Sequence, residues 1–475
     1  MSRRTSFRDP AGVCFAFQDR IFRFVHSQNV SDFQSFLNSP PAVALIAGRR
    51  LIDTKPLGDT ELKAQLQERL TSPESAPEKG LFFEHERVFF PSYPYEWPPE
   101  MLYAAGLLTL ELVQKSFTHG FGLKDATPDN VLFRGTEAVF VDLLSFERRD
   151  PRDPVWTAYA QFVRTFLLPL LANKLWGTRL ADIFLTHRDG LQPEELYRMC
   201  GPSQRLRPPV LGLVSLPVWL SGKARKRSFY EKEHRVEPDK AKFILELLFA
   251  RAGRSLRRLE PSRCEKSAWS NYMETHSYTE QTFGLKQSFV ERALKQFRPK
   301  RVLDIGANTG HFSELAAAQG ATVVAIDSDE SCIGALWKRA NGRKLDILPL
   351  VVDFSRPSPS IGWRNSECLG FLERAASSFD CVFMLAVLHH LLVTERIPLQ
   401  EVLEVAAQIT TDLLVMEYVD PADEMFKTLS RGRGQLFAGL TRAVFENAAQ
   451  QWFQVIDSTQ IGDSPRWLYL LQKKK

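Results

Sequence analysis

The sequence predicts an α/β protein of two domains, with a doubly wound, largely parallel sheet in its C-terminal half. Three observations support this. The chain has 475 residues, which is more than one hydrophobic core usually organises. From residue 284 onward, apolar strand-like runs alternate with segments of helical periodicity, a pattern typical of parallel sheets. Residues 1–262 instead show short strand-like runs followed by long helical patterns, which predicts a separate α+β domain.

Composition places the chain among ordinary globular proteins. Hydrophobic residues make up 44%, charged residues make up 25%, and the formal net charge of +5 neither favours nor excludes a nucleic-acid partner. The six cysteines form no CxxC pair, so neither a disulfide framework nor a metal site is indicated. The amino terminus lacks a secretory pattern and no apolar stretch is long enough for a membrane span. We therefore expect a cytoplasmic protein.

The predicted elements follow one another regularly after a helix over 239–261, which closes the first domain near Pro261. Apolar residues recur at helical spacing in some segments and form short continuous runs, typical of buried strands, in others. The helices are expected at 285–297, 311–320, 331–340 and 398–409. The strands are expected at 301–306, 321–327, 345–353, 381–390, 412–420, 454–459 and 466–472.

The stretch RVLDIGANTGHF (301–312) joins the first of these strands to a helix through a glycine-containing turn. Its order, Asp304, Gly306, Gly310, differs from the G-x-G-x-x-G fingerprint of NAD-binding proteins. Gly306 would let the backbone pass close to a ligand, and Gly310 would let the next helix begin near it. Asp327 ends the second strand, where a carboxylate can bind both ribose hydroxyls, and Asp353 ends the third, near an adenine amino group.

In this order, on consecutive strands, these residues resemble the class I S-adenosylmethionine-dependent methyltransferases over residues 266–475. The resemblance implies a Rossmann-like sheet and S-adenosylmethionine as the cofactor. It also implies that the first motif binds the cofactor, that Asp327 binds its ribose, and that the segment after the fourth strand borders it. The cofactor-binding residues implied are Asp304, Gly306, Asn308, Gly310, Asp327, Asp353, Phe354 and Leu385.

Three residues are candidates for acid–base chemistry at the same edge of the sheet. Either His389 or His390 could be the general base because imidazole titrates near neutral pH, and Glu417 ends the fifth strand. The alternative is that these side chains only shape the loop and cap helices. Tyr278 and Lys286 precede the first strand, where related enzymes lay a helix over the cofactor, and Tyr278 is either a lid or a packing residue.

The first domain contains LKDATPDNVLFRGTEAVFVDLLSF (123–146), in which Asn130 follows Asp125 by five residues and a strand-like run ends at Asp142. This stretch resembles a kinase-like catalytic loop, where a base and metal ligands converge on a phosphate. Leu-Leu follows Asp142 instead of Phe-Gly, and no glycine-rich loop precedes the stretch. The resemblance therefore implies a kinase-like fold without phosphotransfer. An active phosphotransferase, or a turn with local caps only, stays open.

The whole pattern resembles a bacterial family of two-part methyltransferases related to the nodulation protein NoeA, often labelled ribosomal protein L11 methyltransferase-like. It implies a kinase-like domain with a helical connector over 1–262 and a methyltransferase domain over 263–475. We expect methyl transfer to an unidentified acceptor, a small molecule in the first instance and a protein in the second, with no indication of nucleic acid. The alternatives are ATP binding or phosphotransfer by the first domain, and a module that holds the cofactor without turnover.

Overall fold

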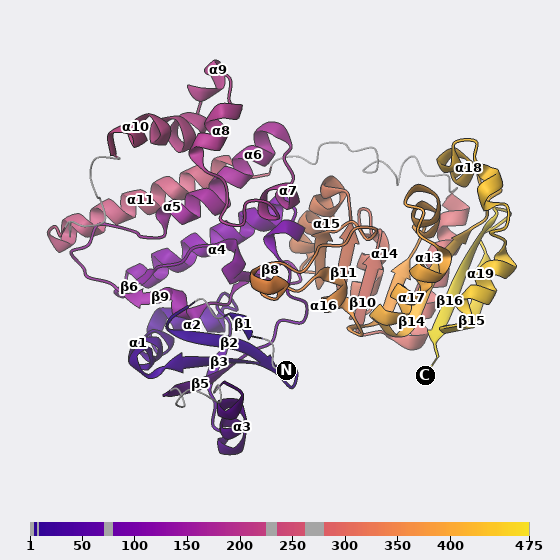
Figure 1. Ribbon diagram of the computed structural model, residues 1–475, viewed down its shortest axis with the longest axis horizontal. Coiled ribbons are helices and arrows are strands. Elements are labelled where there is room, and N and C mark those ends of the chain that lie inside the picture. The colour runs from indigo at the N-terminus through magenta and orange to yellow at the C-terminus, as the bar shows by residue number, and fades with distance from the viewer. Residues whose placement is uncertain (1–3, 7–8, 71–78, 225–234, 262–279, 475) are drawn as a thin grey trace. The chain divides into compact units, whose positions relative to one another are not determined.

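The computed structural model describes residues 4–6, 9–70, 79–224, 235–261 and 280–474 (Figure 1). The chain forms two compact units. The N-terminal unit comprises Met1–Phe133, Ala138–Ser262 and Ile361–Cys368, and the C-terminal unit comprises Arg134–Glu137, Arg263–Ser360 and Leu369–Lys475. Within these described ranges, every helix is too short or too polar to cross a bilayer.

The N-terminal unit begins with an antiparallel sheet in the order β1-β2-β3-β5-β4. Its strands are β1 (Arg4–Ser6), β2 (Gly12–Phe17), β3 (Arg20–His26), β4 (Thr54–Pro56) and β5 (Gly80–His85). Alternate residues of β2, β3 and β5 point to one face, where aromatic side chains form a core. Phe15, Phe22, Phe24 and Phe82 make up much of it.

Helices and two short strand pairs complete this unit. Strand β6 (Phe121–Leu123) pairs with β9 (Phe146–Arg148), and β7 (Val131–Arg134) forms a hairpin with β8 (Glu137–Phe140). The helix expected over 239–261 is confirmed as α11 (Pro238–Arg258). The other helices are α1 (Ser27–Leu37), α2 (Pro40–Ala47), α3 (Thr60–Leu70), α4 (Pro99–Phe117), α5 (Tyr159–Phe162), α6 (Leu168–Trp176), α7 (Leu180–Phe184), α8 (Pro193–Met199), α9 (Pro202–Arg205) and α10 (Leu216–Ala224).

The C-terminal unit is built on a seven-stranded sheet in the order β12-β11-β10-β13-β14-β16-β15, and several of these strands are labelled side by side in Figure 1. Its strands are β10 (Arg301–Ile305), β11 (Thr322–Asp327), β12 (Ile347–Val351), β13 (Phe379–Met384), β14 (Thr410–Val419), β15 (Phe453–Gln460) and β16 (Arg466–Lys473). The five strands from β10 to β14 are parallel, and β16 runs antiparallel between β14 and β15. The predicted doubly wound α/β sheet is thereby confirmed.

Helices flank this sheet. They are α13 (Glu280–Phe297), α14 (His311–Ala318), α15 (Glu330–Arg343), α16 (Phe371–Ala375), α17 (Leu399–Ile409), α18 (Glu424–Ser430) and α19 (Arg442–Ala449). Buried side chains of α13, α14 and α15 share one core with alternate strand residues such as Val302 and Val415. The intervening strand residues point to the opposite face, where α17 packs on β13 and β14. Both faces of the sheet are therefore covered, as a parallel sheet requires.

The segment after the fourth strand differs from the prediction. A strand was expected over 381–390, but β13 ends at Met384. Ala386 has a φ of +58°, a left-handed conformation that turns the chain out of the sheet. His389 is then helical, and the short π-helical segment η7 (His390–Thr394) follows. The apolar run of this stretch predicts burial correctly but does not distinguish a strand from a buried helical turn.

Candidate functional site

The turn after β10 depends on its two glycines. Gly306 has a φ of +72° and Gly310 a φ of +84°, both in the region that favours glycine. A Cβ atom on Gly306 would lie 2.2 Å from Cγ2 of Val387, and one on Gly310 would lie 2.3 Å from Cδ1 of Leu336. The backbone N–H of Gly306 donates to the carbonyl of Ile326 at 2.9 Å, which ties the turn to β11. A larger residue at either position would be strained and would clash.

Asp304 lies in β10 just before this turn and is only 3% exposed. The hydroxyl of Ser313 in α14 donates to its Oδ2 at 2.6 Å. Burial raises the pKa of Asp304 to about 6, and the Ser313 hydroxyl and the Lys286 ammonium oppose that rise. The carboxyl group therefore changes charge near physiological pH.

Asp327, the last residue of β11, is bonded to the same turn. The backbone N–H of Asn308 donates to its Oδ2 at 2.8 Å, and the N–H of Asp329 donates to its Oδ1 at 2.9 Å. Burial raises the pKa of Asp327, and these backbone N–H groups act in the opposite direction. A carboxylate has about four lone-pair sites, so Asp327 can still accept a hydrogen bond from a ligand.

The remaining candidates for the cofactor follow β12 and β13. Burial acts to raise the pKa of Asp353, but hydrogen bonds from the Ser355 hydroxyl and backbone N–H, together with Arg356, lower it overall. Phe354 is half-buried beside Asp353, and Leu385 is buried directly after β13. All eight sequence-predicted cofactor residues thus lie at the carboxyl ends of β12, β11, β10 and β13, or in the turns that follow them. In open α/β sheets this edge is where ligands bind.

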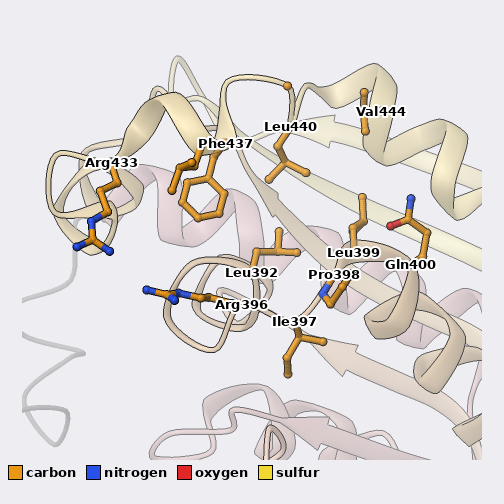
Figure 2. Close-up of a pocket in the computed structure, with 12 residues that line it drawn as sticks. Leu392, Arg396, Ile397, Pro398, Leu399, Gln400, Arg433, Phe437, Leu440 and Val444 are labelled. Atoms are coloured by element: carbon orange, nitrogen blue, oxygen red, sulfur yellow. The ribbon is translucent and has the colours of Figure 1, made fainter.

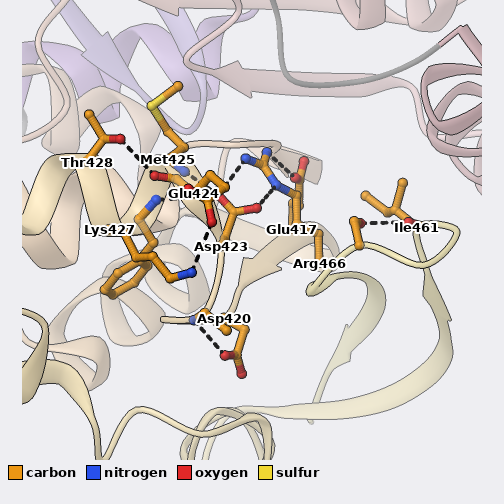
Figure 3. A network of polar contacts seen from close by, with 12 residues as sticks. Glu417, Asp420, Asp423, Glu424, Met425, Lys427, Thr428, Ile461 and Arg466 are labelled. Atoms are coloured by element: carbon orange, nitrogen blue, oxygen red, sulfur yellow. Dashed lines mark hydrogen bonds and ion pairs between the residues drawn. The ribbon is translucent and has the colours of Figure 1, made fainter.

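A buried ionic network lies beside this edge (Figure 3). Glu417 of β14 is fully buried; its Oε2 lies 2.7 Å from Nζ of Lys286 in α13, and its Oε1 lies 3.3 Å from Nη1 of Arg466 in β16. Arg466 also binds both carboxylate oxygens of Asp423, at 2.8 and 2.9 Å. Sequence reasoning missed Arg466 and Asp423 because no local motif connects them. Tyr278 lies outside the described residues.

The two adjacent histidines follow β13. His389 is 2% exposed, and its Nδ1 has no hydrogen-bond partner among the residues that the structure describes. Burial, with help from His390 and Arg466, lowers the pKa of His389 to about 3. Burial and Arg466 also lower the pKa of His390, which is half-buried. Both imidazoles are therefore neutral at pH 7, and each offers one donor and one acceptor nitrogen.

The kinase-like residues of the N-terminal unit also come together. Burial raises the pKa of Asp125, which accepts hydrogen bonds from Gln161 and Asn130 and lies close enough to Asp142 for charge repulsion. Asp142 in turn lies 2.9 Å from Nη1 of Arg23 on β3 and accepts a hydrogen bond from the Ser145 hydroxyl at 2.5 Å. Sequence reasoning missed the role of Arg23, because β3 is remote from the loop along the chain.

Comparisons with known proteins show what this chain is similar to. Residues 278–461 match the family model described as a methyltransferase domain. The chain is 28% identical over 476 residues to nodulation protein NoeA of Rhizobium meliloti (strain 1021), covering 99% of this chain and 96% of that protein.

Two solved structures are also similar. The N-methyltransferase NodS of Bradyrhizobium japonicum WM9 is 14% identical, with a TM-score of 0.31 over 41% of this chain and 98% of that chain. Magnesium protoporphyrin IX methyltransferase of Synechocystis PCC 6803, with bound SAH, is 14% identical, with a TM-score of 0.31 over 43% of this chain and 93% of that chain. The family match and the similarity to NoeA carry the conclusion. The chain is a methyltransferase that uses S-adenosylmethionine, and it is similar to NoeA over almost its whole length.

Proposed function

We propose that the C-terminal domain, residues 263–475, transfers a methyl group from S-adenosylmethionine to a small-molecule acceptor. The observation that carries this proposal is the row of acids Asp304, Asp327 and Asp353 at the carboxyl ends of three neighbouring strands, beside a turn with two left-handed glycines. A nucleoside with a charged amino-acid part needs such a combination of close backbone approach and separate carboxylates.

The residues present fit the cofactor part by part. Asp304 and the turn from Gly306 to Gly310 would hold its amino-acid part, with Asn308 between them. Asp327 would bind the ribose hydroxyls, since a carboxylate has about four lone-pair sites and backbone N–H groups occupy only some of them. Asp353, Phe354 and Leu385 would border the adenine.

When bound, the cofactor supplies an electrophilic methyl group on a positively charged sulfur. The protein has to orient the acceptor and, where needed, remove its proton. Glu417 has a cation within 3.3 Å of each carboxylate oxygen, so we infer that its role is to position the surrounding side chains. We propose that half-buried His390 takes the proton and that His389, neutral and buried, accepts a hydrogen bond from the acceptor.

The test is to incubate the full chain with methyl-labelled S-adenosylmethionine and a cell extract, and then to separate small molecules, protein and RNA. We expect label in the small-molecule pool at a level well above that produced by Asp304→Asn. Label in the protein pool would show instead that the acceptor is a protein. Cofactor binding without label in any pool would favour a module that holds the cofactor without turnover.

A second candidate function concerns residues 1–262, which we propose form a kinase-like domain without phosphotransfer. The convergence of Asp125, Asn130 and Asp142 supports the kinase-like site. The Arg23 guanidinium, 2.9 Å from Asp142, supports the lack of phosphotransfer because it already neutralises the carboxylate that would bind a metal ion. Magnesium-dependent ATP binding and phosphate transfer, both lost in Asp142→Asn, would instead establish an active phosphotransferase.

We also propose a reducing compartment, the cytoplasm, as the location. None of the cysteines within the described residues forms a disulfide, and several are buried, which supports this proposal. They are Cys14, Cys200, Cys332, Cys368 and Cys381. Fractionation of cells with antibodies against the chain would test it, and recovery from an oxidising compartment would contradict it.

A further inference from the structure

A cavity of about 550 Å³ lies in the C-terminal unit between the segment after β13 and the segment after β14 (Figure 2). Its volume is in the range of small-molecule binding sites. Its walls come from η7, the start of α17, the short 3-10 helix η8 (Gly434–Phe437) and the start of α19. The apolar side chains that line it include Leu392, Ile397, Leu399, Phe437, Leu440 and Val444.

Two arginines give this apolar cavity a charged end. Figure 2 shows Arg396 and Arg433 extending toward the same side of the cavity, from the loop before α17 and from the segment before η8. Both side chains are exposed, and within the described part of the chain neither guanidinium has an acidic partner. Glu395, the nearest acid in sequence to Arg396, is paired with Arg356 at 3.0 Å. Among the residues that the structure describes, no carboxylate lines the cavity to balance the two positive charges.

The walls are held in place by contacts outside the cavity. The hydroxyl of Tyr418 donates to the carbonyl of Leu440 at 2.7 Å, which fastens the segment before α19 to β14. The ring of Phe437 packs edge-on against Phe426 of α18, with ring centroids 5.6 Å apart. The backbone of Arg396 itself is in an uncommon left-handed conformation, with a φ of +58°. The cavity is therefore formed before a ligand binds.

The cavity shares one segment with the residues proposed for chemistry. Leu392, which lines the cavity, lies on η7, the segment that begins at His390. The candidate base and one wall of the cavity thus belong to the same short helical segment.

We propose that this cavity binds the methyl acceptor and that the acceptor is amphipathic, with an apolar body and an anionic group, a carboxylate or a phosphate. The apolar wall would bury the body, and the two guanidinium groups would bind the anion in the bidentate manner that arginine favours. This inference rests on the proposed methyl transfer, and it assigns the chemical class of the acceptor.

The test uses calorimetric binding of probes to the full chain with S-adenosylhomocysteine present. The probes are octanoate, octyl phosphate and octanol, each below its aggregation limit. We expect at least one of the anions to bind at least tenfold more tightly than octanol, and the stronger of the two identifies the anionic group. The double variant Arg396→Gln/Arg433→Gln should lose this tenfold preference. Val444→Trp, which fills the cavity from an exposed position, should weaken the binding of all three probes.

The matched control is Arg298→Gln. Arg298 is also exposed and also has a left-handed backbone, with a φ of +48°, but it precedes β10 at the amino end of the strands. This variant should bind the probes as the wild type does. Equal binding of anions and octanol, or no probe binding at all, would overturn the proposal. Failure of S-adenosylhomocysteine itself to bind would count against the proposed methyl transfer, so the two failures are distinguishable.

Discussion

Replacing Asp327 by asparagine tests the assignment of the ribose site. Asn308 and Asp329 each donate one backbone N–H to this carboxylate, at 2.8 and 2.9 Å, and the charged carboxylate can accept further hydrogen bonds from the ribose hydroxyls. Loss of the charge should weaken each of two ribose hydrogen bonds by about 1 kcal/mol, or about 2 kcal/mol together. The dissociation constant of the cofactor should therefore rise roughly 30-fold.

Asp380 provides a matched control at the opposite edge of the same sheet. Its carboxylate also accepts two backbone N–H groups, from Lys300 and Arg301, both at 2.8 Å. An amide can satisfy only one such donor with its oxygen, so Asp380→Asn and Asp327→Asn should lose comparable stability. Calorimetric titration with S-adenosylhomocysteine should find nearly unchanged affinity in Asp380→Asn. Affinities of the two variants within threefold of each other would refute the ribose assignment.

Three further predictions concern charge. Because the pKa of Asp304 is about 6, cofactor affinity should fall as the pH drops from 7 to 5. Asp304→Asn should bind weakly and with a smaller pH dependence, to which Asp327, whose pKa is also raised, still contributes; a wild-type affinity that stays unchanged over that range would contradict this. Arg466→Met leaves two buried carboxylates without this partner and should lower the free energy of unfolding by about 3–5 kcal/mol, as measured by denaturant titration. Replacing the exposed Arg343 by methionine should lower it by less than about 1 kcal/mol. His389 has a pKa of about 3 in the fold and about 6.5 when unfolded, so its contribution to stability is complete above pH 6.5 and is lost as the pH falls toward 3. His389→Asn should therefore lose stability less steeply between pH 6 and 4, by about 1.4 kcal/mol per pH unit, and parallel curves would count against the burial of a neutral imidazole.

Local sequence patterns were sufficient to predict most of the C-terminal sheet. The run RVLDIGANTGHF defines a strand, a left-handed turn and a helix within twelve residues, so its conformation depends little on distant contacts. The common location of the acids at the ends of β11 and β12 is also predictable, because the carboxyl ends of parallel strands meet at one edge of the sheet.

The rest of the site depends on contacts between distant segments. Arg466 binds Asp423, which lies 43 residues away in sequence, and Lys286 reaches Glu417 from a helix that precedes the whole sheet. Hydrophobic periodicity contains no information on such pairs. The sequence does not predict the cavity either, because its walls come from the segments after β13 and β14, which are distant from each other along the chain.

The most direct test of the central claim is a crystal structure of the full chain with S-adenosylhomocysteine. We predict that the ligand lies along the carboxyl ends of β10, β11 and β12, with the Asp327 carboxylate in hydrogen-bond contact with the ribose and the turn at Gly306 against the amino-acid part. A ligand bound anywhere else on the chain would contradict the account.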